Sequence, residues 1–174
     1  MSEIDLQLQA QVADLLYREA CYVDQQRWDE WLELFVPDCE FWAPAWKGEH
    51  TPTEDPHAEV SLVYYSTRAG LEDRVWRIRS GQSVASTPVP RTTHLVGNIR
   101  VDAVREDGCD VSSSFQAHSF FHKTKATEVF FGLYEHRLVR DGGQLRIARK
   151  KVVLMNDYIP TMLDLYNILS LIHI

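Results

Sequence analysis

The sequence predicts an α+β domain in which a curved antiparallel sheet wraps around helices. Two amphipathic helical patterns come first, and four long β-rich runs fill the second half of the chain. The turns between these runs contain Asp107-Gly108 and Gly142-Gly143, which are typical of β-hairpins. At 174 residues the chain fits one domain, residues 1–174, large enough to bury roughly 70% of its unfolded-chain area.

The first predicted helix covers about residues 3–24, and the second follows it closely. The apolar residues of the first recur near helical spacing: Leu8, Val12, Leu15, Leu16, Tyr22 and Val23. Those of the second follow i, i+3, i+4 and i+7: Trp28, Trp31, Leu32 and Phe35. Pro37-Asp38 is expected to close this helix, so the first strand is predicted near residues 40–44.

An exposed loop over 46–57 and a strand over 60–65 are predicted next. Ser66 or Thr67 can cap a third helix, which Gly81 ends. Its apolar face consists of Leu71, Val75 and Ile78. Its charged residues are expected to remain available to solvent or to a partner: Glu72, Asp73, Arg74, Arg77 and Arg79.

After a loop with Pro88 and Pro90, strands are predicted near 92–104, 110–123, 128–140 and 144–155. Helices followed by such a meander favour the cystatin-like cone, the fold of nuclear transport factor, ketosteroid isomerase and scytalone dehydratase. The apolar run 168–174 receives no structural assignment; packing in a subunit interface is one possibility.

Composition limits the classes of function. A formal net charge of −7 and a pI near 5.4 argue against nucleic-acid binding, which needs a basic surface. The beginning of the chain lacks a signal-peptide pattern and no stretch is apolar enough to cross a bilayer, so a cytoplasmic protein is expected. Cys21, Cys39 and Cys109 are widely spaced, which is typical of reduced, mostly buried thiols.

Metal binding by this chain is not predicted. A Rieske cluster needs two Cys-x-His pairs, and the sequence has none. Among the seven histidines only His118 and His122 have suggestive spacing. They fall in a predicted strand, where four residues span about 13 Å, too far for two ligands of one metal ion.

Acid–base catalysis in a cone-shaped pocket is the alternative function, because related folds carry such sites. Candidate lining residues are Tyr17, Asp38, His94, His118 and Tyr134, of which Asp38, His94 and Tyr134 would be catalytic. Each also has an ordinary structural explanation: Asp38 as a turn residue, and the tyrosines as amphipathic core residues.

Aromatic and arginine residues are concentrated in possible recognition surfaces, and such residues are typical interface anchors. Trp28 and Trp31 are expected in the core. The predicted partner interface contains Trp42, Trp46, Trp76, Arg77, Arg79, Arg91 and His94. Arg91 and His94 cannot share one face of a regular strand, and hydrogen bonds to loop carbonyls are an equal alternative for them.

Three irregular segments carry a resemblance to a known family: EFWAPAW (40–46), LEDRVWRIRSGQSVASTPVPRTTHLVGNIRV (71–101) and RKKVVLMNDYI (149–159). LYREA, TEDP, SLVYY and GLEDRV add to it, in that order. With these motifs, residues 15–166 resemble the small (β) subunit of bacterial aromatic-ring-hydroxylating dioxygenases. The similarity is greatest to the benzoate, anthranilate and halobenzoate group.

The resemblance implies a non-catalytic subunit of an oxidoreductase. In that family the large (α) subunit holds the [2Fe-2S] Rieske cluster, the mononuclear non-haem iron and the aromatic substrate, and NADH supplies electrons through a reductase. The implied assembly has three α and three β subunits. The implied reaction adds both atoms of dioxygen to an aromatic acid, giving a cis-dihydrodiol or, after loss of a substituent, a catechol. No cofactor is implied for this chain itself.

Overall fold

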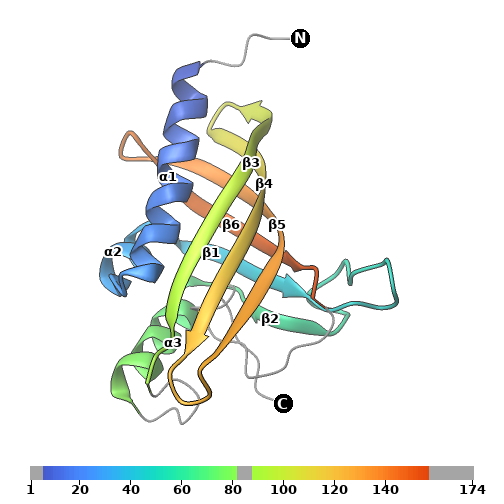
Figure 1. Ribbon diagram of the computed structural model, residues 1–174. Helices are drawn as coiled ribbons and strands as arrows, with labels where there is room; N and C mark the ends of the chain where they lie inside the picture. The colour runs from blue at the N-terminus through green and yellow to red at the C-terminus, as the bar shows by residue number, and fades with distance from the viewer. Residues whose placement is uncertain (1–5, 82–87, 157–174) are drawn as a thin grey trace.

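The computed structural model describes residues 6–81 and 88–156. The helices of this part are α1 (Leu6–Asp24), α2 (Trp28–Glu33) and α3 (Arg68–Ser80). The strands are β1 (Phe35–Pro44), β2 (Ser61–Tyr65), β3 (Arg91–Arg105), β4 (Gly108–Phe121), β5 (Ala126–Asp141) and β6 (Gln144–Leu154). Figure 1 shows α1 crossing one face of the strongly twisted sheet, with α3 packed near one end.

The strands form a single sheet in the order β2-β1-β6-β5-β4-β3. The four long strands β3 to β6 are a meander of antiparallel neighbours, which confirms the predicted hairpins. Gly142 and Gly143 make the last turn with φ of 58° and 84°, a left-handed backbone that glycine adopts without steric cost. The sheet is thus curved, mostly antiparallel and covered by helices, as the sequence predicted.

The boundary between the second helix and the first strand differs from the prediction. α2 ends at Glu33 and β1 begins at Phe35, so Pro37 and Asp38 lie within a strand instead of closing a helix. The cause is a long-range parallel pairing with β6, in which the Ile147 N–H donates to the Leu34 carbonyl at 2.8 Å. The pairing is irregular between Phe35 and Glu40, and proline is tolerated at such an interruption.

The core lies between α1 and the inner face of the sheet. Five residues of the predicted helical stripe are buried: Leu8, Val12, Leu15, Leu16 and Val23. Alternation along β4 places Val111, Phe115 and Ala117 on the inner face, in the same core. The opposite, outer face of the meander carries no described helix in Figure 1.

The third helix matches its predicted faces with one exception. Leu71, Val75 and Ile78 are buried, and Gly81 ends the helix in the left-handed conformation with φ of 64°. Arg74, predicted on the solvent side, is buried at 2% exposure. The loop after β1 is mainly exposed as predicted, although Thr53 in it is buried. The unassigned run 168–174 lies outside the described residues.

None of the described helices is both long and apolar enough to span a membrane.

Candidate functional site

A buried ion pair joins α1 to the inner face of the sheet. The Lys150 ammonium on β6 donates to Glu19 Oε1 at 2.6 Å, and both side chains are almost fully buried. His136 on β5 lies beside them, with Nε2 3.6 Å from Glu19 Oε2, slightly beyond hydrogen-bonding distance. Lys150 also sits 3.9 Å from the centre of the Tyr134 ring, a cation–π contact.

The three ionisable groups of this cluster have shifted pKa values. Burial alone would raise the pKa of Glu19, but Lys150 and His136 outweigh it and bring the pKa to about 2. Burial lowers the pKa of Lys150, and Glu19 opposes that shift. Burial also lowers the pKa of His136 and outweighs the opposing effect of Glu19. The cluster therefore holds a paired carboxylate and ammonium next to a neutral imidazole.

A second polar pair ties the end of α1 to β3. Asp24 accepts hydrogen bonds from Thr92 Oγ1 and the His94 N–H, both at 2.8 Å. His94 Nδ1 lies 2.6 Å from Asp24 Oδ1. Because an ionised carboxylate only accepts, Nδ1 carries the hydrogen. Burial favours a higher pKa for Asp24, but the His94 contacts outweigh it and the pKa is lowered.

The interior has part of the chemistry of an acid–base site. His94 Nε2 and the Tyr134 hydroxyl are buried without a hydrogen-bond partner. Burial, followed by the charges of Glu19 and Asp24, raises the pKa of Tyr134 well above its usual value. A carboxylate-oriented histidine in the same interior as a phenol resembles a general-base arrangement.

The structure changes the predicted catalytic set. Asp38 is exposed on β1, and the carboxylate that orients His94 is Asp24. Tyr17 is 51% exposed on α1, and His118 is on the outer face of β4. His94 and Tyr134 are therefore the two members that lie inside. Asp38 does not join them because it lies at an exposed position of a strand, not at the predicted helix end.

The sequence prediction missed Glu19, Asp24, His136 and Lys150. Glu19 lies in phase with the buried apolar stripe of α1, and this placement of a carboxylate was the available signal. Lys150 likewise occupies an inward position of β6, two residues before Val152. A charged residue in phase with buried apolar positions indicates a buried ion pair, but its partner on another element cannot be read from local spacing.

Two of the predicted interface tryptophans are structural. Trp42 is 1% exposed, and its indole N–H donates to Ser61 Oγ at 2.8 Å. The Arg149 guanidinium and the Lys151 ammonium of the neighbouring strand β6 lie over its ring, at 5.8 and 5.3 Å from the ring centre. Trp46 is half-buried and donates to the Leu154 carbonyl at 2.8 Å. Trp42 is therefore corrected from a surface anchor to a core residue.

The remaining predicted interface residues are exposed, apart from His94. Trp76 on α3 is 63% exposed, and Arg77 and Arg91 are also at the surface. Arg79 is exposed but engaged: its guanidinium donates to both carboxylate oxygens of Asp29, at 2.9 and 2.8 Å. Of this set, Trp76 best keeps the features of an interface anchor.

Metal ligands do not converge in residues 6–81 and 88–156, where no group of three or more His, Cys, Asp or Glu side chains could hold an ion. His118 lies in β4 and His122 lies beyond its end. Cys39 and Cys109 are buried free thiols as predicted, whereas Cys21 is exposed. Burial raises the pKa of Cys39 to about 11, so this thiol is unreactive.

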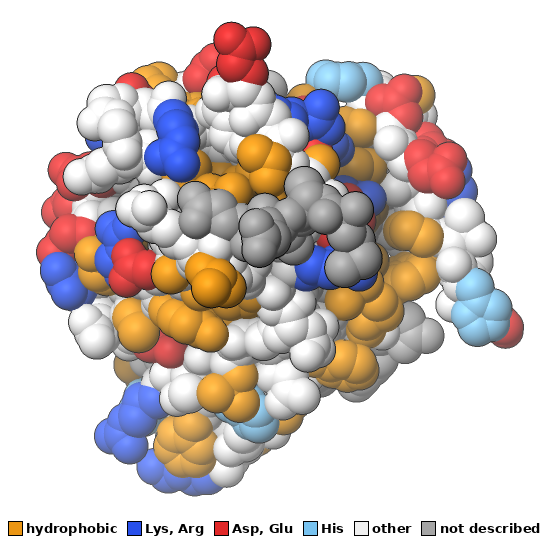
Figure 2. All heavy atoms as spheres, turned by 90° about the horizontal axis from the view of Figure 1, so that it is seen from above, with side chains coloured by type: hydrophobic (Ala, Val, Ile, Leu, Met, Phe, Trp, Pro, Cys, Tyr) orange, Lys and Arg blue, Asp and Glu red, His pale blue; other side chains and the backbone are white. Residues whose placement is uncertain are grey.

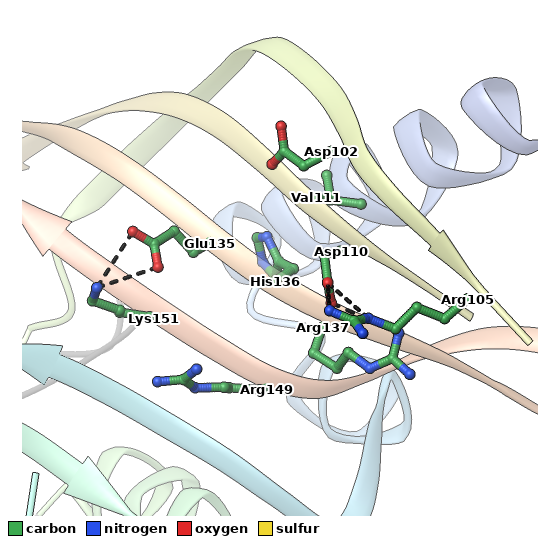
Figure 3. A pocket seen from close by; sticks show the side chains of 9 residues that line it. All are labelled: Asp102, Arg105, Asp110, Val111, Glu135, His136, Arg137, Arg149 and Lys151. Atoms are coloured by element: carbon green, nitrogen blue, oxygen red, sulfur yellow. Dashed lines mark hydrogen bonds and ion pairs between the residues drawn. The ribbon is translucent and has the colours of Figure 1, made fainter. Parts of the chain in front are cut away.

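A charged groove of about 510 Å³ crosses the outer face of the meander (Figure 3). Arg137 on β5 is directly opposite Arg149 on β6. Arg137 pairs with Asp107, and Arg149 donates to Glu40 at 2.7 Å. Figure 3 shows Lys151 reaching Glu135 at the other side of the groove. The bases that line the groove are therefore paired with acids of the chain itself.

Several known proteins about 40% identical to this chain are subunits of aromatic-ring dioxygenases. The family described as "Ring hydroxylating beta subunit" matches residues 18–161. The benzoate 1,2-dioxygenase subunit beta of Acinetobacter baylyi is 39% identical, over 91% of this chain and 92% of that protein. The 2-halobenzoate 1,2-dioxygenase small subunit of Burkholderia cepacia is 41% identical, over 90% of this chain and 94% of that protein.

Solved structures agree with the fold. The benzoate 1,2-dioxygenase β subunit of Burkholderia mallei is 34% identical with a TM-score of 0.77, covering 97% of this chain and 100% of that chain. A scytalone dehydratase-like protein of Novosphingobium aromaticivorans has a TM-score of 0.67 at 20% identity, covering 91% of this chain and 93% of that chain. The second likeness concerns the fold alone and confirms the predicted cystatin-like cone.

Proposed function

The chain belongs to the family of ring-hydroxylating β subunits, and on that premise we propose that it is the structural subunit of a multicomponent aromatic-ring dioxygenase. Its role is to assemble with a large subunit that performs the oxidation. The observation that carries the proposal is the identity of about 40% over nine tenths of the chain to subunits of benzoate-type dioxygenases.

The substrate of the assembled enzyme is an aromatic carboxylic acid. Relatives named for benzoate, 2-halobenzoate and anthranilate support this substrate class. In the overall reaction the ring takes up both atoms of dioxygen, and NADH and a proton supply the two electrons and the hydrogens that complete a cis-dihydrodiol. Where a hydroxylated ring carbon carries a halide or an amino group, loss of that group together with the carboxyl group as carbon dioxide yields a catechol without a further oxidant.

The cofactors of this reaction are placed in the large subunit: a [2Fe-2S] Rieske cluster and a mononuclear non-haem iron, with NADH acting through a reductase. The donor set of the described part of this chain does not fit either iron centre. Three copies of each subunit form the proposed assembly. The reduced free thiols agree with the cytoplasm, where the NADH-dependent reaction is placed.

The alternative is a free-standing isomerase or dehydratase that uses the interior of the cone. The pairing of Asp24 with His94 and the unpartnered Tyr134 hydroxyl are the observations in its favour. Against it, Lys150 and Glu19 fill the centre of the interior and satisfy each other. The structural role therefore has the stronger support.

Co-expression tests the proposal. A tagged large subunit of a benzoate-type dioxygenase should retain this chain in equal amount, and the complex with its reductase should convert benzoate to its cis-dihydrodiol with NADH. Failure of the large subunit to retain the chain under conditions in which both are folded contradicts the proposal. Turnover by the lone chain would favour the alternative instead.

A further inference from the structure

A row of four side chains crosses the outer face of the sheet at the end of β6. Leu95 on β3 pairs with Gln116 on β4, and Gln116 pairs in turn with Phe131 on β5. The Met155 N–H donates to the Phe131 carbonyl at 2.8 Å, which extends the row beyond β6. Leu95, Phe131 and Met155 are 56%, 46% and 39% exposed. Large apolar side chains that are open to solvent therefore make up most of the row.

An uncharged hollow of about 440 Å³ lies along this row. The row lines it together with Gly97, Ser114 and Leu133, and none of its described lining residues is charged. Gly97 is directly opposite Ser114, and Ser114 is directly opposite Leu133. A Cβ on Gly97 would have no atom within 4 Å. The hollow therefore exists because two small residues lie side by side among large ones.

This apolar group differs from ordinary surface residues. Scattered apolar side chains are normal on a protein surface, and Figure 2 shows small groups of them among charged ones on the face that it presents. The members of the row, by contrast, are in register on neighbouring strands and border one hollow. A contiguous group of this kind is typical of a surface that another segment covers. Because the lining offers no charge, a charged occupant would lose its hydration without gaining an ion pair.

The part of the chain that the structure describes ends at the rim of this hollow. Asn156 follows Met155, and its side chain binds two backbone groups of β5. Its Oδ1 accepts from the Phe131 N–H at 3.0 Å, and its Nδ2 donates to the Val129 carbonyl at 3.1 Å. These bonds hold Asn156 against β5, beside the row. The segment that continues from it, residues 157–174, therefore starts next to the hollow.

The sequence of residues 157–174 suits an uncharged apolar surface. Lys and Arg do not occur in this segment. Its large apolar side chains are those of Ile159, Met162, Leu163, Leu165, Ile168, Leu169, Leu171, Ile172 and Ile174. From β6 to β3 the row crosses strands spaced about 4.8 Å apart, a total of about 14 Å. An extended chain covers about 3.3 Å per residue, so about five residues reach across.

We propose that residues 157–174 cross the outer face from β5 to β3 and cover the hollow with their apolar side chains. Covalent attachment selects this occupant. A segment tethered by a short linker has an effective concentration on the order of mM, so even weak apolar contacts keep it in place against a second copy or another molecule. The proposal concerns the isolated chain and does not depend on the proposed function.

Contacts between methyl groups test the placement in the full chain. In protein with labelled Ile, Leu and Val methyl groups, nuclear Overhauser effects are expected between residues 159–174 and the methyl groups of Leu95 and Leu133. Their absence overturns the proposal, as does contact of the segment with another part of the surface alone. Light scattering of the same sample should give the mass of one chain. A dimer with these contacts would place the segment on a second copy and would also overturn the proposal.

A charge at the floor of the hollow tests the same placement by a second route. Gly97→Glu has free space for its side chain, so the melting temperature should be unchanged. Chymotrypsin cleavage within residues 157–174, followed by mass, should become about tenfold faster than in the wild type, because the released segment is open to the protease. Gly48→Glu is the matched control: it adds the same charge at another open glycine, outside the hollow, and should be cleaved like the wild type. Equal cleavage of the wild type and Gly97→Glu contradicts the proposal, and the methyl contacts decide the point if Gly97→Glu is less stable.

Discussion

At the scale of single residues, the interior shows how burial and pairing oppose each other. Taking Glu19 and Lys150 out of water costs free energy, and their contact at 2.6 Å offsets that cost only while both are present. His136 and Tyr134 complete the polar environment, and neither ring nitrogen of His136 has a hydrogen-bond partner. Removing one member of the pair should therefore destabilise the fold more than replacing both members with apolar side chains.

Breaking the pair on one side tests this dependence. Lys150→Met leaves the Glu19 carboxylate buried and uncompensated, and should lower the free energy of unfolding by about 3–5 kcal/mol. The double variant Glu19→Leu/Lys150→Met replaces the pair with apolar side chains and should recover most of that loss. Urea unfolding of the three proteins measures both effects. A double variant no more stable than Lys150→Met would contradict the argument.

The same cluster predicts acid sensitivity. The pKa of Glu19 is about 2 in the folded protein against an ordinary value of 4.5, so its stabilisation is present above pH 4.5 and is lost as pH falls toward 2. The lowered pKa of His136 acts in the same direction, because the unfolded state takes up a proton at a higher pH than the folded state does. Stability should thus decrease steadily on acidification below about pH 6.5.

The variant Glu19→Gln separates the two contributions. It removes the carboxyl titration, so the free energy of unfolding should change less steeply below about pH 4.5 than in the wild type. The decline that begins near the ordinary pKa of histidine should persist, because His136 remains. Urea midpoints measured across this pH range decide the point, and equal slopes in both proteins at the acidic end would refute it.

At the scale of elements, the sequence predicted the helices and strands that depend on local residue spacing. It was misleading for the strand boundary that depends on pairing with a segment distant in the chain. The stripe of α1 and the four meander strands were predicted from residue spacing and turn residues. The start of β1 was not, because its parallel partner β6 is more than a hundred residues away in the chain. The same long-range placement buries Trp42, whose local sequence is compatible with a surface position.

The link between α1 and β3 depends on Asp24. Its carboxylate accepts from Thr92 Oγ1, from the His94 N–H and from His94 Nδ1. Asp24→Ala should therefore lower the free energy of unfolding by about 2–3 kcal/mol, since donors to a charged acceptor are left unpaired. Asp14→Ala on the exposed side of α1 removes only a surface ion pair and should have little effect. Similar losses in the two variants would contradict this role.

The exposed side of α3 offers a separate interface test. Trp76→Ala should weaken retention by the large subunit without lowering the melting temperature, because the side chain is 63% exposed and contributes little to the core. Arg79→Ala should affect assembly less, since Arg79 is already engaged by Asp29 within the chain. A lowered melting temperature with normal retention in Trp76→Ala would make that residue structural.

At the scale of the whole molecule, the two faces of the sheet differ in burial and in the charges that they carry. The inner face packs against α1 and holds the buried pair of Glu19 and Lys150, whereas the outer face has one hollow lined by exposed apolar side chains and one lined by paired charges. The sequence predicted His94 and Tyr134 for the interior, but it could not show that Lys150 and Glu19 would fill the space between the helix and the sheet. It also could not bring together the side chains that line the charged groove, because they come from four strands.

Because Glu19 and Lys150 fill the interior, the isolated protein is expected to have no activity of its own. Purified without the large subunit, the chain should fold, contain no stoichiometric iron, lack the visible absorption of a Rieske cluster and convert no aromatic acid. Addition of the large subunit and its reductase should supply the iron, the visible absorption of the Rieske cluster and the formation of the cis-dihydrodiol. His94→Ala is the informative control: in the structural subunit it should leave the turnover rate per intact complex unchanged. Turnover by the isolated chain that disappears in His94→Ala would instead identify the interior as an active site and overturn the structural role.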